Sequence, residues 1–507
     1  MRRFVCVLST ILVVLNVIIA KERLPETINK YQPAIFPLIS PDGDELFFSR
    51  KWHPENTGGI DDDDDIWVSQ KKENHWVTPQ KLDEPINNKK SNTMLYIFPD
   101  GKKALIFGPY LKSKEKNFTL NNESNYCFAI AKRKDKKWEC IEPLFIEDFY
   151  SKSKNYSATM STDSRILIMS LQRDDSKGNL DLYISFYNPE TNSYSKPVNL
   201  GNKINTTGVE LVSFLAYDNR TLYFASNGRT SKGKLDLYLT RRLDDTWLNW
   251  SEPVSIDLFN SEWDENSLSL NITGDTAYFT SGDTLEKREG IYFAELPEKF
   301  RPLPYLVIQG NILTEEGNKS EPIKVPVYFK VDNFDTDFIF NDTIYNGKFR
   351  FVVPYKTQYN FFISANGFLD YSFSTNSSKF SEPTIQNYDI VLQKQKNSTE
   401  LIGTIYFETD VDTLDRNSIA LLKQLCKKLS KEKFSRILIV GHTDEVGTDE
   451  YNMDLSIRRA KNTARFIISS LKIGDDKVSI EGKGKTQPIS KDLSKNRRVE
   501  IFLINNE

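Results

Sequence analysis

The turn Ser40-Pro41-Asp42-Gly43, followed by the apolar run Leu46-Phe47-Phe48, opens a unit that repeats along more than half of the chain. Proline presets the backbone for a tight turn and Asp-Gly completes it, so the unit predicts a hairpin between two strands. Equivalent aspartates follow one another at steps of 58, 63, 55 and 57 residues. The later copies are Phe98-Pro99-Asp100-Gly101, Ser161-Thr162-Asp163-Ser164, Ala216-Tyr217-Asp218-Asn219 and Thr273-Gly274-Asp275.

The repeats also share a later strand and a closing segment that runs from an aromatic residue to a proline. In the first unit the later strand is Asp65-Ile66-Trp67-Val68, and Trp76 and Pro79 close the unit. Four strands per unit at this spacing are typical of a β-propeller blade, and we expect five or six blades. The fifth unit lacks its closing strand before Pro302, whereas Leu24–Asn29 resembles the tail of a unit. We therefore expect the N-terminus to complete the last blade and close the ring.

These units resemble the TolB-type propeller repeats of exported bacterial proteins, and Pro41-Asp42-Gly43 and Asp65-Ile66-Trp67 match best. The resemblance implies a TolB-like β-propeller over residues 21–302, although the third and fourth turns have lost their proline and glycine. The turn aspartates are expected to cap their own backbone amides. The acidic run Asp61–Asp65 is expected to be a solvated loop, because it lacks the alternating ligands and the glycine of a calcium-binding loop.

The composition excludes several classes of protein. The 507 residues carry 67 Lys and Arg against 70 Asp and Glu, a formal net charge of −3. This balance argues against a basic nucleic-acid-binding protein and against an acidic disordered chain. The three His and four Cys show no zinc-ligand spacing, so we expect neither a metal nor a cofactor. At roughly 100–200 residues per domain, the length predicts about three domains.

Residues 1–20 predict an export signal. Arg2 and Arg3 precede the apolar stretch Val5–Ile19, and Ala20 supplies a small residue before a polar segment. The alternative is an uncleaved membrane anchor, because the stretch is only slightly shorter than a membrane span. The mature chain is expected outside the cytoplasm in either case.

An exported chain meets conditions in which disulfides persist. Cys127 and Cys140 flank a basic turn between two strand-like runs, and the pattern fits either a cross-strand disulfide or two separate thiols. Cys426 falls on the apolar face of a predicted helix and is expected to be a buried thiol.

The pattern then changes to shorter alternating strands, about seven of them, which predict a small β-sandwich over residues 303–395. Gly347-Lys348-Phe349, before a strand that ends at Pro354, and the later turn Gly367-Phe368 resemble the carboxypeptidase-regulatory modules. We find no catalytic constellation here and expect a spacer. Lys394–Thr399 is expected to be a polar linker.

The last part of the chain alternates between strands and helices. Apolar spacing predicts one helix with Leu422, Leu425 and Leu429 on a single face, and a second helix at about Asn452–Leu471. Strands are predicted at Ile402–Phe407, Ile437–Val440, Val478–Glu481 and Val499–Ile504. Two helices on one face of a small mixed sheet give an α+β layer, so the chain as a whole is predicted to be multidomain.

Gly441-His442-Thr443-Asp444-Glu445-Val446-Gly447 follows the second of these strands, and Arg459-Ala460 and Asn496-Arg497-Arg498 come later in the same frame. With these motifs, residues 400–507 resemble the C-terminal, peptidoglycan-binding domain of the OmpA family. The resemblance implies that Asp444 and Arg459 bind diaminopimelate in the peptidoglycan stem peptide. It also implies a periplasmic, outer-membrane-associated location in a Gram-negative-type bacterium, with membrane association through partners or through an uncleaved signal.

The chemistry of diaminopimelate suits these residue types. Its side chain ends in an ammonium and a carboxylate on one carbon. Asp444 suits the ammonium, and Arg459 offers the carboxylate a planar, two-pronged donor. Thr443, Asn452 and the amides near the helix start are expected to bond the peptide oxygens. Arg497 is a further candidate ligand, although in the family its segment mainly shapes the fold.

The chain departs from the family pattern at two places. Glu408 stands where the family has an aspartate after the first strand, so a contact from its side chain must reach one methylene further. Only eleven residues separate Gly484 from Asn496, which is expected to alter the rim of the pocket. His442 is expected to pack or hydrogen-bond beside the loop, without a catalytic role.

These patterns predict a non-enzymatic envelope protein that is anchored noncovalently to peptidoglycan and whose propeller binds an unidentified protein or glycan. One alternative is a wall-tethered propeller glycosidase or lyase. Such an enzyme needs paired acids in the central funnel, and neither such a pair nor a Gly-x-Ser-x-Gly elbow is found in the sequence. The other alternative is a purely structural envelope linker.

Overall fold

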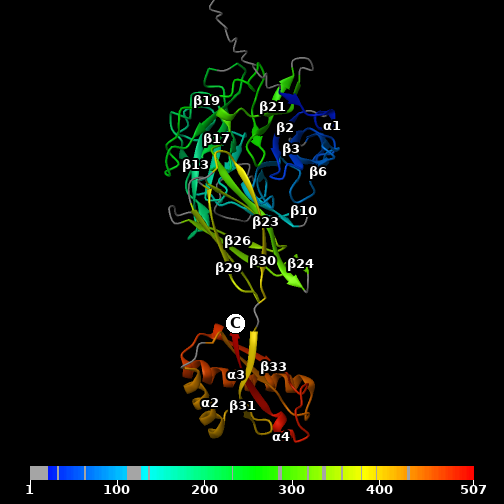
Figure 1. Cartoon of the computed structure of the whole chain (residues 1–507). Coiled ribbons are helices and arrows are strands. Elements are labelled where there is room, and N and C mark those ends of the chain that lie inside the picture. The colour runs from blue at the N-terminus through cyan, green and yellow to red at the C-terminus, as the bar shows by residue number, and fades with distance from the viewer. Residues whose placement is uncertain are drawn as a thin grey trace, which may run out of the picture. The chain divides into compact units, whose positions relative to one another are not determined.

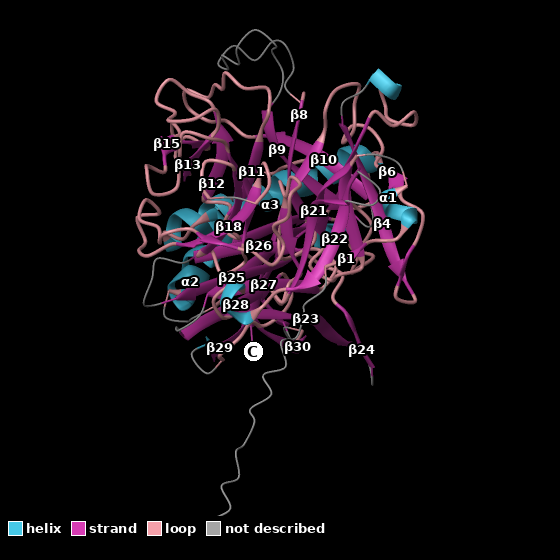
Figure 2. Cartoon of the chain, turned by 90° about the horizontal axis from the view of Figure 1, so that it is seen from above, coloured by secondary structure: helices cyan, strands magenta, loops and turns pink. Residues whose placement is uncertain are grey.

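The computed structural model consists mainly of β-strands, with two long helices near the C-terminus (Figure 1, Figure 2). It forms two compact units, one of residues 1–364 and 370–391 and the other of residues 365–369 and 392–507. The predicted export signal lies outside the described residues, and no helix within them is long and apolar enough to cross a membrane. The described residues are 21–30, 33–61, 64–110, 127–134, 137–230, 232–283, 288–316, 319–333, 339–354, 358–377, 380–394, 397–430 and 434–506.

Five antiparallel sheets make up most of the first unit, and each sheet comes from one of the five sequence repeats. Within each sheet the first three strands of the repeat lie side by side in chain order, because each turn returns the chain along its own preceding strand. The strands are β2 (Ala34–Ile39), β3 (Glu45–Lys51), β4 (Asp64–Lys72), β5 (His75–Trp76) and β6 (Gln80–Lys81); β7 (Thr93–Ile97), β8 (Lys103–Gly108), β9 (Cys127–Lys134) and β10 (Lys137–Pro143); β11 (Ser157–Met160), β12 (Ile166–Leu171), β13 (Asp181–Asn188), β14 (Ser193–Tyr194) and β15 (Val198–Asn199); β16 (Glu210–Leu215), β17 (Thr221–Ser226), β18 (Asp236–Arg241) and β19 (Val254–Ser255); and β20 (Leu268–Leu270), β21 (Thr276–Asp283) and β22 (Arg288–Glu295).

The first strands of the five sheets contact one another in cyclic order: β2 with β7, β7 with β11, β11 with β16, β16 with β20, and β20 with β2. The start of the described chain completes the last sheet, since β1 (Glu22–Arg23) pairs with β22. The prediction that the N-terminus completes the last repeat is therefore confirmed. The pairing strand lies just before the predicted segment Leu24–Asn29, where the short helix α1 (Glu26–Asn29) forms instead.

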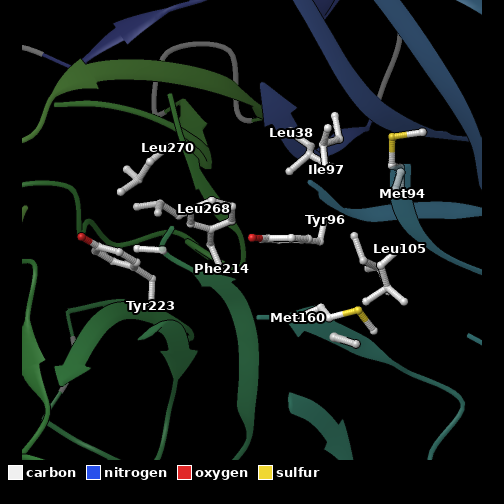
Figure 3. Close-up of a cluster of buried hydrophobic side chains, with 14 of the residues drawn as sticks. Leu38, Met94, Tyr96, Ile97, Leu105, Met160, Phe214, Tyr223, Leu268 and Leu270 are labelled. Carbon is white, nitrogen blue, oxygen red and sulfur yellow. The ribbon is translucent and has the colours of Figure 1, made fainter. Parts of the chain in front are cut away.

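Apolar side chains fill the space between these first strands (Figure 3). Tyr96, Met160 and Phe214 are almost completely buried, and the ring centroids of Tyr96 and Phe214 are 5.8 Å apart. Only a small cavity of about 20 Å³ remains, lined by apolar side chains and serines that all five sheets contribute. The centre is a packed core.

The turn aspartates bond their own turns, as predicted. Asp218 accepts hydrogen bonds from the amides of Arg220 and Thr221, both at 2.8 Å. In the acidic run, Asp65 accepts the amide and the hydroxyl of Thr57 at 2.6 and 2.9 Å. Asp65 is completely buried, so this part of the run is not a solvated loop; another part lies outside the described residues.

Two further four-stranded sheets complete the first unit, with one strand more than the seven predicted. Phe329 of one sheet packs on Phe349 and Phe351 of the other, with ring centroids 5.2 and 4.6 Å apart. The first of these sheets contains β23 (Tyr305–Glu316), β24 (Lys319–Pro322), β27 (Lys348–Pro354) and β30 (Thr384–Leu392), and the second contains β25 (Val327–Asn333), β26 (Ile339–Ile344), β28 (Gln358–Ala365) and β29 (Tyr371–Asn376).

The first of these two sheets shares a core with the five-sheet part. Tyr305, Val307 and Val352 belong to the same buried cluster as Tyr217 of the fourth repeat. The Tyr305 hydroxyl donates a hydrogen bond to the carbonyl of Ile272 at 2.7 Å. The two-sheet part is therefore packed into the first unit, and its role as a spacer stays a prediction.

The second unit is built on a four-stranded sheet in the order β31-β34-β32-β33. Its strands are β31 (Asn397–Tyr406), β32 (Arg436–Gly441), β33 (Val478–Gly482) and β34 (Arg498–Asn506). β32 and β33 are parallel and the other pairs are antiparallel, so the predicted mixed sheet is confirmed. β31 begins at Asn397, inside the predicted linker, so this linker is shorter than expected.

Two helices, α2 (Arg416–Leu429) and α3 (Asp449–Leu471), contact this sheet and each other. Each has an N-cap that accepts a backbone hydrogen bond: Asp415 from Ser418 at 2.7 Å and Thr448 from Tyr451 at 3.2 Å. The cap at Thr448 explains why α3 begins three residues before the predicted start. Short helical turns lie at η1 (Gly59–Asp61), η2 (Glu298–Phe300), η4 (Asp475–Lys477) and α4 (Leu493–Asn496).

The strand register separates Cys127 from Cys140. Cys127 begins β9, whereas Cys140 lies in β10 at a bulge beside the pair formed by Ile141 and Ala131. Along β9, Cys127 lies four residues before Ala131, beside which Cys140 sits. At about 3.3 Å per residue, the Cα atoms of the two cysteines are therefore much further apart than the roughly 7 Å that a disulfide spans. The register therefore places the two positions apart along the strands. Cys426 is buried, as predicted, and burial raises the pKa of its thiol.

Candidate functional site

The predicted binding residues gather at one edge of the C-terminal sheet. The register pairs Tyr406 with Arg498, and Gly441 with both Val499 and Gly482. The ends of β31, β32 and β33 and the start of β34 therefore lie side by side. The loops that leave this edge meet near the beginning of α3, because the loop after β32 leads directly into that helix.

Gly441 allows this edge to approach α3 closely. A Cβ atom on Gly441 would lie 2.0 Å from the carbonyl oxygen of Ser456, a distance that backbone atoms do not tolerate. Ser456 donates its hydroxyl to the Met453 carbonyl at 2.7 Å and accepts the amide of Gly484 at 3.1 Å. The glycine of the sequence motif thus sets the spacing between strand and helix that the site requires.

Arg459 extends its guanidinium from α3 into the backbone of the surrounding loops. Nε donates to the carbonyl of Val411 at 2.7 Å, Nη1 to that of His442 at 3.2 Å and Nη2 to that of Glu408 at 3.0 Å. The guanidinium also lies 5.1 Å from the ring centroid of Phe407. A guanidinium carries five N–H donors, so two of them have no partner within the described part of the chain.

The charge of Arg459 is costly to bury. Arg459 is 0% exposed, and burial lowers its pKa to about 10, while the Asp444 carboxylate acts in the opposite direction. The side chain therefore remains charged at neutral pH. Its hydrogen-bond partners are neutral carbonyls, so an anion placed on the two remaining N–H groups gains a charge-assisted interaction.

Asp444 forms its ion pair with Arg497. The Arg497 Nη1 and the Asp444 Oδ2 are 3.0 Å apart, and Asp444 also accepts the amide of Val446 at 3.2 Å. Arg497 donates in addition to the carbonyl of Phe407 at 3.0 Å. The structure thus brings Asp444, Arg459 and Arg497 together. Arg497, which the sequence offered only as a further candidate ligand, is the ion-pair partner of Asp444. A carboxylate has about four acceptor positions, so Asp444 retains capacity for a ligand.

The other predicted residues take different positions. Thr443 is 3% exposed, and its hydroxyl has no partner among the described residues. Asn452 is buried and donates its side-chain amide to the Val446 carbonyl at 3.0 Å, which holds the loop against the helix start. The side chain of Glu408 is exposed, and only its backbone carbonyl contacts Arg459.

His442 is buried beside the loop, as predicted. Its Nε2 lies 3.2 Å from a carboxylate oxygen of Glu500. Burial lowers the pKa of this imidazole, and Arg498 acts in the same direction. Within the described ranges, no group of three or more His, Cys, Asp or Glu side chains is arranged to hold a metal ion.

Sequence reasoning missed the backbone partners of Arg459 and the contact in which the Tyr451 hydroxyl donates to Asp410. Backbone carbonyls have no residue-type signature, so no pattern in the sequence marks Val411 as a partner. Phe407 was recognised only as the end of a strand, although its ring covers the guanidinium.

The model of the OmpA family matches residues 406–501. Outer membrane protein A of Bordetella avium is 36% identical over 104 residues, which cover 20% of this chain and 53% of that protein. The peptidoglycan-associated lipoprotein of Pseudomonas aeruginosa is 35% identical over 105 residues, 20% of this chain and 61% of that protein. The chain thus spans between half and two thirds of the length of these relatives.

Among solved structures, the peptidoglycan-associated lipoprotein from Burkholderia pseudomallei is 32% identical. That match covers 20% of this chain and 89% of the other, with a TM-score of 0.19. The matches in sequence show that residues 406–501 form an OmpA-family domain. All six predicted site residues lie inside it.

Proposed function

We propose that the C-terminal domain binds peptidoglycan noncovalently through the diaminopimelate of its stem peptide. The observation that carries this proposal is the unused polar capacity of two adjacent groups: two N–H donors of Arg459 and about half of the acceptor positions of Asp444. Membership of residues 406–501 in the OmpA family supports it, as does the similarity to a relative that is named for its association with peptidoglycan.

In this proposal the two ends of the ligand side chain take opposite partners. The ammonium lies against Asp444, whose second oxygen stays with Arg497. The carboxylate receives the two remaining N–H groups of Arg459. The unpartnered hydroxyl of Thr443 donates to a peptide oxygen nearby. Recognition depends on charge-assisted hydrogen bonds, which are stronger and more directional than neutral ones.

Binding requires a local opening of the site. Arg459 has no exposed surface, so the ligand carboxylate reaches it only when the segment Glu408–Val411 moves aside. The cost of this step is offset by the charge-assisted hydrogen bonds that the ligand carboxylate accepts from the two remaining N–H groups of Arg459. Asn452 keeps the opposite wall of the site in place through its bond to Val446.

For the first unit we infer a five-bladed TolB-like β-propeller followed by a β-sandwich of the carboxypeptidase-regulatory type. One sheet per repeat, the cyclic contacts of the first strands and the pairing of β1 with β22 support this assignment. The propeller serves as a protein- or glycan-binding platform in the periplasm, associated with the outer membrane. Export depends on residues 1–20, and membrane association on partners or on an uncleaved signal.

We propose no enzymatic activity. The glycosidase alternative needs two carboxyl groups about 5–10 Å apart at a central site. The cavity between the first strands is lined by apolar side chains and serines, which supply no such pair. Incubation of the mature chain with wall glycans should release no reducing ends. Measurable release would support the glycosidase alternative instead.

Co-sedimentation of the mature chain with purified diaminopimelate-containing peptidoglycan tests the binding site. We expect Arg459→Ala to weaken binding at least about thirtyfold, because losing one partner of a buried charge pair commonly costs 2 kcal/mol or more. The matched control is Arg465→Ala, which removes an exposed arginine from the same helix and should bind like the unchanged chain.

A second pair of variants tests the ammonium partner. Asp444→Asn keeps an acceptor for the Val446 amide but loses its charge, so binding should fall about tenfold or more. Glu445→Gln changes the exposed neighbouring acid and should have little effect. Peptidoglycan with lysine in place of diaminopimelate should bind weakly, because lysine lacks the second carboxylate. Full binding by folded Arg459→Ala and Asp444→Asn chains would refute the site.

A further inference from the structure

A cleft of about 670 Å³ in the first unit is lined by aromatic, charged and small polar side chains. It lies at segments that belong to the last two repeats and to the start of the described chain. Its lining includes Lys21, Lys232, Ser261, Glu262, Trp263 and Tyr292.

Two glycines allow Trp263 to lie close to the backbone in this cleft. A Cβ on Gly282 would lie 2.1 Å from the indole ring, and a Cβ on Gly233 would lie 2.1 Å from the Trp263 carbonyl. The indole is half-buried, so part of its surface remains open to the cleft. The backbone around it therefore fixes Trp263 as a flat, apolar surface on the cleft wall.

A network of hydrogen bonds holds the segment that carries Trp263. The Trp263 amide donates to the Ser261 hydroxyl at 3.2 Å. Ser261 in turn donates its amide and its hydroxyl to the carboxylate of Glu265 at 3.0 and 2.6 Å. Glu265 is completely buried and also accepts the hydroxyl of Ser281. A wall fixed in this way loses little conformational entropy when a ligand binds.

The charges around the cleft balance. The Lys21 ammonium donates to Ser281 at 2.8 Å and lies 3.9 Å from the buried Glu265 carboxylate. Lys232 is exposed and donates one hydrogen bond, to the Asp257 carbonyl at 2.7 Å. Its ammonium has three N–H groups, so two remain for a ligand. Exposed Glu262 supplies acceptors of the opposite charge.

An aromatic surface beside balanced donors and acceptors suits a sugar ring. The C–H groups on one face of a pyranose carry partial positive charge and pack on the negative face of an indole, while the hydroxyls at its edge need both donors and acceptors. Among the described residues, the lining contains no aliphatic residue that would receive an apolar peptide residue or a lipid tail. Because Lys21 and Lys232 are matched by Glu262 and Glu265, net charge does not favour an anion.

We propose that this cleft binds a neutral pyranose unit of a glycan, with Trp263 as the stacking surface and with Lys232 and Glu262 as partners of the ring hydroxyls. This inference deepens the platform role proposed above for the first unit. It does not depend on wall binding by the C-terminal domain.

Ligand-observed saturation-transfer NMR on the mature chain tests this site, with maltotriose, mannotriose and triacetylchitotriose as probes, each at about 10 mM because single-sugar sites bind near the millimolar range. At least one trisaccharide should show saturation transfer. Trp263→Ala should lower its affinity about tenfold or more, and Trp263→Phe, which keeps a ring, should restore part of it. Lys232→Ala should give a smaller loss.

Trp52→Ala provides the matched control, because Trp52 is an exposed tryptophan of the first repeat and should leave saccharide binding unchanged. Arg459→Ala should also leave it unchanged, which separates this site from peptidoglycan binding. Three results would overturn the inference: no transfer to any of the trisaccharides, equal binding by a folded Trp263→Ala chain, or binding of a tetraglutamate peptide in their place.

Discussion

Asp218 of the fourth repeat and Asp444 of the C-terminal domain are both buried aspartates in a turn after a strand, yet they differ in what they bond. Asp218 accepts the amides of Arg220, Thr221 and Leu303 and the hydroxyl of Thr221, each at 2.7–2.8 Å. Asp444 accepts one amide, from Val446, and one arginine N–H. When the fold fills all the hydrogen-bond acceptor sites of a carboxylate, that carboxylate stabilises the fold. When some acceptor sites stay open beside arginines, the carboxylate remains available to a ligand.

The same difference separates the two units of the chain. In the five-sheet part, the buried acids Glu210 and Glu265 are occupied by backbone amides and hydroxyl groups. In the C-terminal domain, the guanidinium of Arg459 and the carboxylate of Asp444 each keep unused hydrogen-bonding capacity. Burial alone therefore does not identify a binding residue. A binding residue is identified by how few hydrogen-bond partners the fold itself supplies to it.

The largest expected effect is on stability, at Asp218. Asp218→Ala leaves several buried donors without an acceptor, at about 1–3 kcal/mol for each group, and should lower the free energy of unfolding by about 3–5 kcal/mol. Chemical denaturation measures this loss. Peptidoglycan binding should remain unchanged under conditions where the variant is folded.

Asp444→Asn gives the reverse pattern and is the matched partner for that experiment. It should destabilise the protein less than Asp218→Ala, because it keeps an acceptor for the Val446 amide and loses only the ion pair with Arg497, and it should weaken wall binding about tenfold or more. If Asp444→Asn destabilised the protein as strongly as Asp218→Ala, the distinction between saturated and open carboxylates would be wrong.

A smaller effect is expected at Gly441. Gly441→Ala places a Cβ against the Ser456 carbonyl and should cost about 2 kcal/mol through overpacking between β32 and α3. It should also weaken peptidoglycan binding, because the loop that carries Asp444 moves with this strand. Gly403→Ala is a control in the same domain, since its Cβ would meet neighbours only at 3.5 Å or more.

The smallest effect concerns pH and His442. Burial and Arg498 lower the folded-state pKa of His442 below 6.5, although Glu500 opposes them, with Lys483 as the remaining charged neighbour. As pH falls below 6.5, the unfolded chain takes up a proton before the folded one does, so this residue makes the domain less stable. His442→Gln should therefore reduce the drop in thermal stability between about pH 7.5 and pH 5.5. An unchanged or larger drop would contradict this role.

Local patterns predicted much of the C-terminal domain because its elements obey simple rules. Leu422, Leu425 and Leu429 are buried on one side of α2, as helical spacing requires. The N-terminal strand that completes the last repeat also followed from an incomplete unit in the sequence. Boundaries were less accurate, as at β31, because polar residues such as Asn397 gain strand structure only from the partner strand β34.

The sequence alone determined five repeats, an α+β domain at the C-terminus, and the acid and the arginines of one binding motif, because turn chemistry, apolar periodicity and motif spacing are local properties. Tertiary structure decided which charges meet. It paired Asp444 with Arg497 across 53 residues, surrounded Arg459 with carbonyls, and merged the two-sheet part into the core of the first unit. Such contacts depend on strand register and on the close approach of strand and helix at residues such as Gly441. Both the register and this approach become fixed only when distant segments pack together.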